Sequence, residues 1–267
     1  MKLRSVIGAL GFVAALLASV PAGAEIVPHR AAYTLSLGSA RPNSGITGIE
    51  GVMVFDWSAV CEGWTLNQRM TFRIYDSDGQ AIENDISFSS FESADGRNYR
   101  FSVRTVVDNE VTEQLRGRAA RTGEGGGRAV FSEPDGETVE LPPGTVFPTE
   151  HTRMLIARAA AGDRSMARMV FDGATLDGAF DTNAVIAQAV AGDPPSGANI
   201  AASLVSGRSW RVRIAYFKTG DGSTEPDYEL SMRLFENGVG GDFLFEYGEF
   251  SIRARLDRLE PLPQSGC

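Results

Sequence analysis

The sequence is poor in the residues that most often perform catalysis or bind metals. It contains only two histidines, His29 and His151, and two cysteines, Cys61 and Cys267. Neither cysteine has a histidine or a second cysteine nearby in the sequence, whereas a zinc site needs about four clustered ligands. No His-Glu-x-x-His motif, Gly-x-Ser-x-Gly elbow or phosphate-binding Gly-x4-Gly-Lys-Ser/Thr loop occurs. We therefore expect a protein that is not an enzyme and uses no metal or cofactor.

One catalytic alternative remains, a hydrolase that pairs His29 or His151 with a carboxylate. His151 would lie in the first turn of an expected helix, and His29 lies close to the expected mature N-terminus. Packing or capping is the more ordinary role of such isolated histidines, and substitution of both would decide between the two interpretations.

Positive charge is also scarce. Beyond residue 24 the only lysine is Lys218, and 34 acidic residues face 25 basic ones in the whole chain. Without residues 1–24, which contain Lys2 and Arg4, the balance is 34 acidic against 23 basic residues, a net charge of −11. Such a chain repels nucleic acid and anionic lipid surfaces.

Long apolar runs are absent except at the N-terminus. Lys2 and Arg4 precede the apolar stretch 6–19, and the small residues of 22–24 follow it. This pattern is typical of a secretory signal peptide, and the stretch is too short for a stable membrane span. We expect cleavage after residue 24 and a single periplasmic domain over 25–267 that does not span a membrane.

The two cysteines then favour a disulfide, since an even number of cysteines in an oxidising compartment is usually paired. A bond between Cys61 and Cys267 would close a long loop and stabilise the fold by about 5 kcal/mol in the loop-entropy model.

Apolar and polar residues alternate with a period of two from Val52 almost to the C-terminus. Successive side chains of a strand point to opposite faces, so each segment has one buried and one solvated face. Parallel strands covered on both faces would instead form continuous apolar runs. We therefore expect an antiparallel sheet, and its clearest strands are 64–75, 98–107, 210–216, 228–234 and 250–256.

Residues that favour tight reversals separate these segments at 76–79, 94–96, 134–136, 220–222 and 236–238. Strands joined so closely are expected to be neighbours in a meander of roughly a dozen strands. The glycine-rich segment 123–127 lacks the lysine of a phosphate-binding loop and is expected to form a hairpin tip. A sheet this long should twist, curl or close to protect its edges.

One helix is expected over 150–161, with Thr149 as its capping residue, Pro148 just before it and Gly162 at its end. Segment 183–191 is ambiguous between helix and strand. The face of the first helix that packs on the sheet would consist of Met154, Leu155 and Ala159.

Aromatic residues concentrate on the apolar parity of the expected strands. Ordinary sheet core is the simpler interpretation. A curled sheet could also leave a hydrophobic groove for a lipid, glycolipid or lipoprotein acyl chain. The candidate lining residues of such a groove are Trp57, Trp64, Phe72, Phe101, Trp210 and Tyr216.

Several motifs, taken in order along the chain, resemble one known family. They are 27–31 with Tyr33, the Cys-Glu-Gly-Trp of 61–64, the Phe-Pro-Thr-Glu-His of 147–151, the Pro-Asp-Tyr-Glu of 226–229, the Glu-Asn-Gly of 236–238 and the final Cys267. Each motif alone is short, but the ordered set spans nearly the whole mature chain. It resembles the cell-envelope integrity protein B family of Gram-negative periplasms.

The resemblance implies a mainly β fold, a long antiparallel meander wound into an open, spiral β-barrel with a helix inside or against it. This architecture is similar to that of periplasmic lipoprotein carriers. The resemblance also implies a Cys61–Cys267 disulfide, a role in envelope integrity under stress and a tetratricopeptide-repeat partner. It brings no catalytic residues. We therefore expect a non-enzymatic scaffold for a protein partner, with a lipid carrier or sensor as the alternative.

Overall fold

The computed structural model describes residues 25–122, 125–190, 195–220 and 222–264. The expected signal peptide and Cys267 lie outside the described residues. Eight strands precede the helix: β1 (His29–Ala40), β2 (Ile46–Val60), β3 (Gly63–Asp76), β4 (Ala81–Ser93), β5 (Asn98–Val107), β6 (Glu110–Arg121), β7 (Gly127–Glu133) and β8 (Asp135–Leu141). Helix α1 (Pro148–Ala161) is followed by β9 (Ser165–Val170), β10 (Phe180–Ala189), the short 3-10 helix η2 (Ala202–Leu204), β11 (Ser209–Lys218), β12 (Tyr228–Phe235), β13 (Gly240–Glu246) and β14 (Phe250–Pro261).

The fourteen strands of the described residues form one antiparallel sheet in the order β8-β7-β6-β5-β4-β3-β2-β1-β14-β13-β12-β11-β10-β9. Strands that follow one another in the chain pair directly, apart from β8 and β9, which are separated by α1. In addition, β1 pairs with β14. The expected antiparallel meander is therefore confirmed. The sheet is not closed into a barrel, because β8 and β9 are its two edges.

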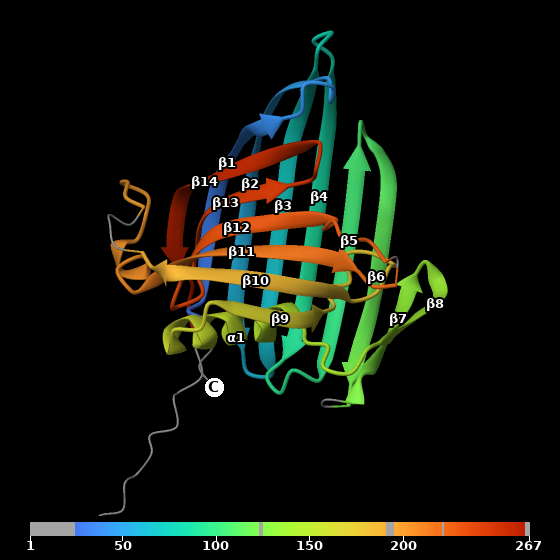
Figure 1. Cartoon of the computed structure of the whole chain (residues 1–267), viewed down its shortest axis with the longest axis vertical. Helices are drawn as coiled ribbons and strands as arrows, with labels where there is room; N and C mark the ends of the chain where they lie inside the picture. Colours follow the sequence, from blue (N-terminus) through green and yellow to red (C-terminus); the bar gives the residue numbers. More distant parts are fainter. Residues whose placement is uncertain (1–24, 123–124, 191–194, 221, 265–267) are drawn as a thin grey trace, which may run out of the picture.

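The sheet curls so that β9–β14 lie across the strands of the first half, with α1 at one end of the space between the two layers (Figure 1). Side chains from both layers fill this interior. Tyr33 of β1 meets Phe243 of β13 edge to face, with ring centroids 5.1 Å apart, and donates its hydroxyl to the carbonyl of Gly240 at 2.9 Å. Burial of aromatic and aliphatic side chains between the layers is the main stabilising contribution of such a fold.

The buried residues form three clusters. One joins β1, β2 and β3 to β13 and β14, and a second joins β5, β6 and β7 to the segments before α1 and after β9. The third packs α1 on β9, β10, β11 and β12 through Leu155, Ile156 and Ala159, with Met154 at its border. This confirms the expected packing face of the helix.

The start of α1 differs from the expected one. Helical residues begin at Pro148, and Phe147 occupies the capping position without a capping side chain. Thr149 lies within the helix, and its backbone N–H binds a carboxylate from β4 instead. The expected end at Gly162 is confirmed, since this glycine has the left-handed conformation at φ 89°. The ambiguous segment 183–191 lies mostly in strand β10.

Each expected turn whose residues are described joins two consecutive strands. Residues 123–124 of the glycine-rich segment lie outside the described residues, and its remainder leads into β7. No helix in the described part of the chain combines the length and apolarity needed to cross a bilayer.

Candidate functional site

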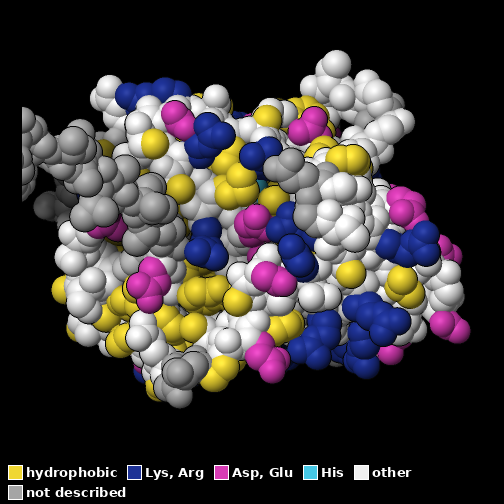
Figure 2. Space-filling view, turned by 90° about the horizontal axis from the view of Figure 1, so that it is seen from below, with side chains coloured by type: hydrophobic (Ala, Val, Ile, Leu, Met, Phe, Trp, Pro, Cys, Tyr) yellow, Lys and Arg dark blue, Asp and Glu magenta, His cyan; other side chains and the backbone are white. Residues whose placement is uncertain are grey.

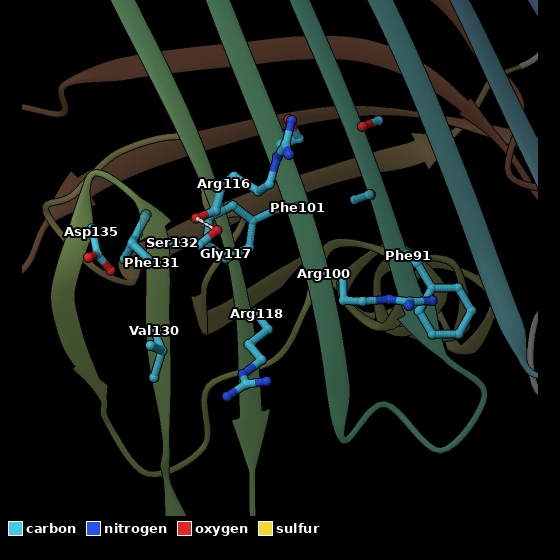
Figure 3. A pocket seen from close by; sticks show the side chains of 13 residues that line it. Phe91, Arg100, Phe101, Arg116, Gly117, Arg118, Val130, Phe131, Ser132 and Asp135 are labelled. Carbon is cyan, nitrogen blue, oxygen red and sulfur yellow. Dashed lines mark hydrogen bonds between the residues drawn. The ribbon is translucent and has the colours of Figure 1, made fainter.

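A broad hollow of about 820 Å³ lies on the outer face of β4, β5, β6 and β7. Figure 3 shows the arginines of neighbouring strands around it, with Arg100 extended toward Phe91. Its lining combines serines and arginines with the apolar residues Phe91, Phe101, Val130 and Phe131; the polar members include Ser89, Ser102, Ser132, Arg100, Arg116 and Arg118. Asp135, at the start of β8, is the one acidic residue of the lining.

The strand register places two arginines side by side in this hollow. Arg100 of β5 lies directly opposite Arg118 of β6, and Ser102 lies opposite Arg116. Like charges at directly opposed positions destabilise a strand pair. In the described part of the chain neither Arg100 nor Arg118 forms an ion pair, and Arg116 reaches Glu133 only at 3.8 Å. The guanidinium of Arg100 lies over the Phe91 ring, 4.6 Å from its centroid.

Several arginines elsewhere on the outer face follow the opposite pattern, although Arg211 and Arg233 of the other layer are also directly opposed. Arg73 pairs with the directly opposed Glu83 at 2.6 Å, and Arg30 pairs with the directly opposed Asp56 at 2.6 Å. Arg213 in the other layer contacts Glu229 at 2.5 Å. The hollow thus brings three arginines together, and two of them, Arg100 and Arg118, form no ion pair in the described structure.

The floor of the hollow depends on Gly117. This residue lies on β6 between Arg116 and Arg118, and a Cβ there would lie 2.5 Å from the ring of Phe101. Phe101 and Phe131 flank it on the two neighbouring strands, and both rings are buried in the core below the sheet. Because Gly117 lacks a side chain, the Phe101 ring can lie directly beneath the arginines.

The view from the end that carries α1 shows a group of Lys and Arg side chains at one side of the surface and hydrophobic side chains mainly at the other (Figure 2). Beneath this end, a polar network anchors α1. The buried Glu92 of β4 accepts the backbone N–H of Thr149 at 2.7 Å and that of Glu150 at 2.9 Å. A carboxylate at a helix N-terminus satisfies free N–H groups and interacts favourably with the helix dipole.

Arg121 provides the second anchor. Its guanidinium donates to the carboxylate of Glu150, to the carbonyl of Gly96 and, at 2.9 Å, to the carbonyl of Thr145. The Arg121 side chain is only 9% exposed. The segment that enters α1 is therefore held by β4 through Glu92 and by β6 through Arg121.

Burial changes the proton affinity of two groups near the start of α1. Desolvation raises the pKa of Glu92 from 4.5 to about 7, although its bonds to the helix N–H groups oppose this rise. Desolvation, together with the nearby charge of Arg168, lowers the pKa of His151 from 6.5 to about 4. The two groups therefore favour their neutral forms at mildly acidic pH.

Both histidines are enclosed. His29 is fully buried, its Nδ1 lies 2.7 Å from the carbonyl oxygen of Val27, and burial lowers its pKa. His151 is 4% exposed, with Nε2 3.4 Å from the hydroxyl of Thr182. Neither ring is presented to a solvent-accessible substrate, and no three potential metal ligands cluster among the described residues.

The six candidate groove residues are distributed over the interior. Phe72 belongs to the first cluster and Phe101 to the second. Trp210 belongs to the third cluster, and Tyr216 packs against that cluster. Trp57 is buried beside His29, and Trp64 is half-buried. They do not gather around one cavity in the described structure, and a lipid groove stays a prediction.

Cys61 lies exposed in the turn between β2 and β3 and is not a free thiol. Its expected partner Cys267 lies outside the described residues, so the pairing stays a prediction.

Sequence reasoning missed Glu92, Arg116, Arg118 and Arg121. The apolar–polar alternation of segment 98–107 gives Arg100 the parity of the solvated face, and the structure places it there.

Comparison with known proteins connects this fold to a family. The model of the EipB-like family matches residues 21–263. The chain belongs to the EipB-like family. The resemblance read from the ordered motifs is thereby confirmed.

The chain is similar to a named protein and to a solved structure, both from Brucella abortus. The cell envelope integrity protein EipB of Brucella abortus (strain 2308) is 35% identical over 257 residues, which cover 94% of this chain and 89% of the relative. A solved structure, described as a beta-barrel-like protein of domain of unknown function DUF1849 from Brucella abortus, superposes with a TM-score of 0.83 at 33% identity. That match covers 90% of this chain and 99% of the other. The EipB-like chain is thus related over most of its length to a cell-envelope integrity protein.

Proposed function

We propose that this EipB-like protein is a non-enzymatic periplasmic protein that supports cell-envelope integrity as a binding scaffold for a protein partner. The observation that carries the proposal is the relationship to EipB over 94% of the chain. The signal-peptide pattern of residues 1–24 supports export, and the enclosure of both histidines supports a role other than hydrolysis. The open, arginine-lined hollow on the outer sheet face supports a function in binding rather than in chemistry.

A deletion strain tests this function. We expect loss of the protein to sensitise cells to detergent and to cell-wall antibiotics, and the full chain to restore resistance. A chain without residues 1–24 should be produced but should fail to restore it, because it would stay in the cytoplasm. Resistance restored equally by the truncated chain, or a deletion strain as resistant as its parent, would contradict the proposal.

A crosslinking experiment tests the scaffold itself. A photoreactive residue at Ser102 in the hollow should capture one reproducible envelope protein in living cells. The same residue at Val185, which is 63% exposed on the other layer, provides the matched control. Identical adducts from both positions, or none from either, would argue against a specific partner.

A further inference from the structure

We infer that the hollow around Arg100, Arg116 and Arg118 is the docking site for an acidic segment of a partner protein. This inference rests on the proposed scaffold function and names the surface and the chemistry of the partner. Its first support is the contrast within one sheet face. Arg30 and Arg73 face carboxylates across the strand pair, whereas Arg100 and Arg118 face each other and form no ion pair in the described structure.

Such an opposition is unfavourable for the isolated protein. Two guanidinium groups on directly paired strands repel each other, and in the described structure no carboxylate offsets this repulsion at Arg100 or Arg118. An arriving carboxylate removes the repulsion and forms charge-assisted hydrogen bonds, which arginine makes in a planar, two-pronged geometry. The binding of a carboxylate is therefore favoured by an arrangement of positive charges that is already present in the free protein.

The chain as a whole has a net charge of −9, which makes a local cationic surface more specific. The surrounding negative charge weakens attraction to anionic surfaces in general, so a partner must place its acidic residues within the hollow itself.

The lining favours an acidic protein segment over a lipid. Serine hydroxyls lie among the arginines, the Phe101 and Phe131 rings are buried in the core, and Arg100 covers Phe91. Val130 adds an exposed apolar side chain to the lining, but an acyl chain would leave the guanidinium groups of Arg100 and Arg118 without a partner of opposite charge. The hollow also extends over four strands with a volume of about 820 Å³, so it is larger than a single inorganic anion requires and suits several carboxylates in succession.

Binding of a defined acidic probe gives the direct test. A fluorescein-labelled glutamate peptide is titrated with the full chain and followed by anisotropy, with the equivalent glutamine peptide as the neutral control. We expect binding of the glutamate peptide alone, with an affinity that falls as salt increases. The double variant Arg100→Gln/Arg118→Gln should weaken binding at least about tenfold.

A charge-matched variant controls for the field of the whole molecule. Arg73→Gln/Arg213→Gln removes two positive charges from arginines that are paired with Glu83 and Glu229 outside the hollow. It should bind the glutamate peptide within about twofold of the unmodified protein. Equal weakening by both double variants, or equal binding of the glutamate and glutamine peptides, would overturn the inference. Circular dichroism and urea unfolding establish that each variant is folded.

Two further experiments distinguish an anionic lipid from an acidic protein segment as the ligand, and failure of the docking site from failure of the proposed function. Phosphatidylglycerol vesicles should not retain the protein, and retention that depends on Arg100 and Arg118 would overturn an acidic protein segment as the ligand. In the deletion strain, Arg100→Gln/Arg118→Gln should fail to restore detergent resistance. Full restoration by this variant would overturn the docking site and leave the scaffold function intact. Failure of the unmodified chain would instead overturn the function, whatever the peptide shows.

Discussion

Glu92 and His151 respond to pH in opposite directions, although both act near the first turn of α1. A buried carboxyl group with a raised pKa binds its proton more tightly in the folded protein than in the unfolded chain. Its contribution to stability is complete below the unfolded pKa of 4.5 and is lost as pH rises through the folded pKa of about 7. His151 has a lowered pKa, so stability is lost as pH falls from 6.5 toward about 4.

Substitution of each residue should therefore change the pH profile of unfolding with opposite sign. In Glu92→Gln, the decrease in the free energy of unfolding between pH 4.5 and 7 should become smaller, by up to about 3 kcal/mol. In His151→Gln, the loss of stability on acidification should become smaller. Urea unfolding at a series of pH values measures both slopes, and a Glu92→Gln profile parallel to that of the unmodified protein would rule out the proposed protonation.

The residues of the site differ in how far the sequence could predict them. Glu92 lies on the same parity of β4 as Ile86 and Phe88, so a carboxylate on the apolar face was a visible signal that it needed a buried partner. Nothing local identified the N-terminus of α1, 57 residues later, as that partner. Arg100 could be assigned to the solvated face by its parity alone. Its opposition to Arg118 could not, because parity does not give the register of neighbouring strands.

At the scale of the element, the entrance of α1 is anchored by contacts separate from those of its packing face. Phe147 is fully buried and stacks on Tyr99 of β5, with ring centroids 4.8 Å apart and an interplanar angle of 14°. The guanidinium of Arg121 lies over the Phe147 ring, 5.5 Å from its centroid. Val146, just before α1, also forms a bridge with Val170 of β9. The segment that enters α1 therefore connects the first half of the sheet to β9, one of the two open edges of the sheet.

Arg121→Gln should destabilise the protein more than the loss of an exposed arginine. The substitution removes the ion pair with Glu150 and leaves backbone carbonyls of Gly96 and Thr145 without this donor. Because Glu150 is 35% exposed and solvent can compensate in part, we expect a loss of about 2 kcal/mol. The control is Arg128→Gln, whose arginine is 63% exposed and pairs with Glu140, with an expected loss of at most about 1 kcal/mol. Equal urea midpoints for the two variants would contradict an anchoring role for Arg121.

The strands were more predictable than the start of the helix. Segment 98–107 coincides with β5, because alternation of apolar and polar residues depends only on local sequence and on one buried face. The entrance of α1 was misassigned because a threonine before a glutamate is typical of a cap, whereas Glu92 already supplies the acceptors from a distant strand. Local capping signals fail where tertiary structure satisfies the same N–H groups.

At the scale of the whole molecule, the pairing of β1 with β14 brings the first and last strands of the described chain together. His29 of β1 lies opposite Trp57 on one side and Pro261 on the other, and the N–H of Leu262 donates to the carbonyl of Pro28 at 2.9 Å. Cys61 follows directly after β2, at the same end of the sheet. The alternation of apolar and polar residues predicts a curled antiparallel meander. Only the register of β1 with β14 and with β2 shows that β14 ends near the turn between β2 and β3.

This geometry sharpens the disulfide prediction. Cys61→Ser and Cys267→Ser should lower the thermal midpoint equally, and the double variant should unfold at the same temperature as either single variant, since one missing sulfur already prevents the bond. The loop-entropy model sets the loss of stability at about 5 kcal/mol before any strain in the folded protein is subtracted. Reduction of the unmodified protein should reproduce the same midpoint without a further effect on the variants. Because the bond would tie the last residue beside the β2–β3 turn, its loss should free the end of β14 first, and hydrogen exchange there should rise before global unfolding. Unequal midpoints for the two single variants, or titratable thiols in the native oxidised protein, would show that the cysteines do not form this pair.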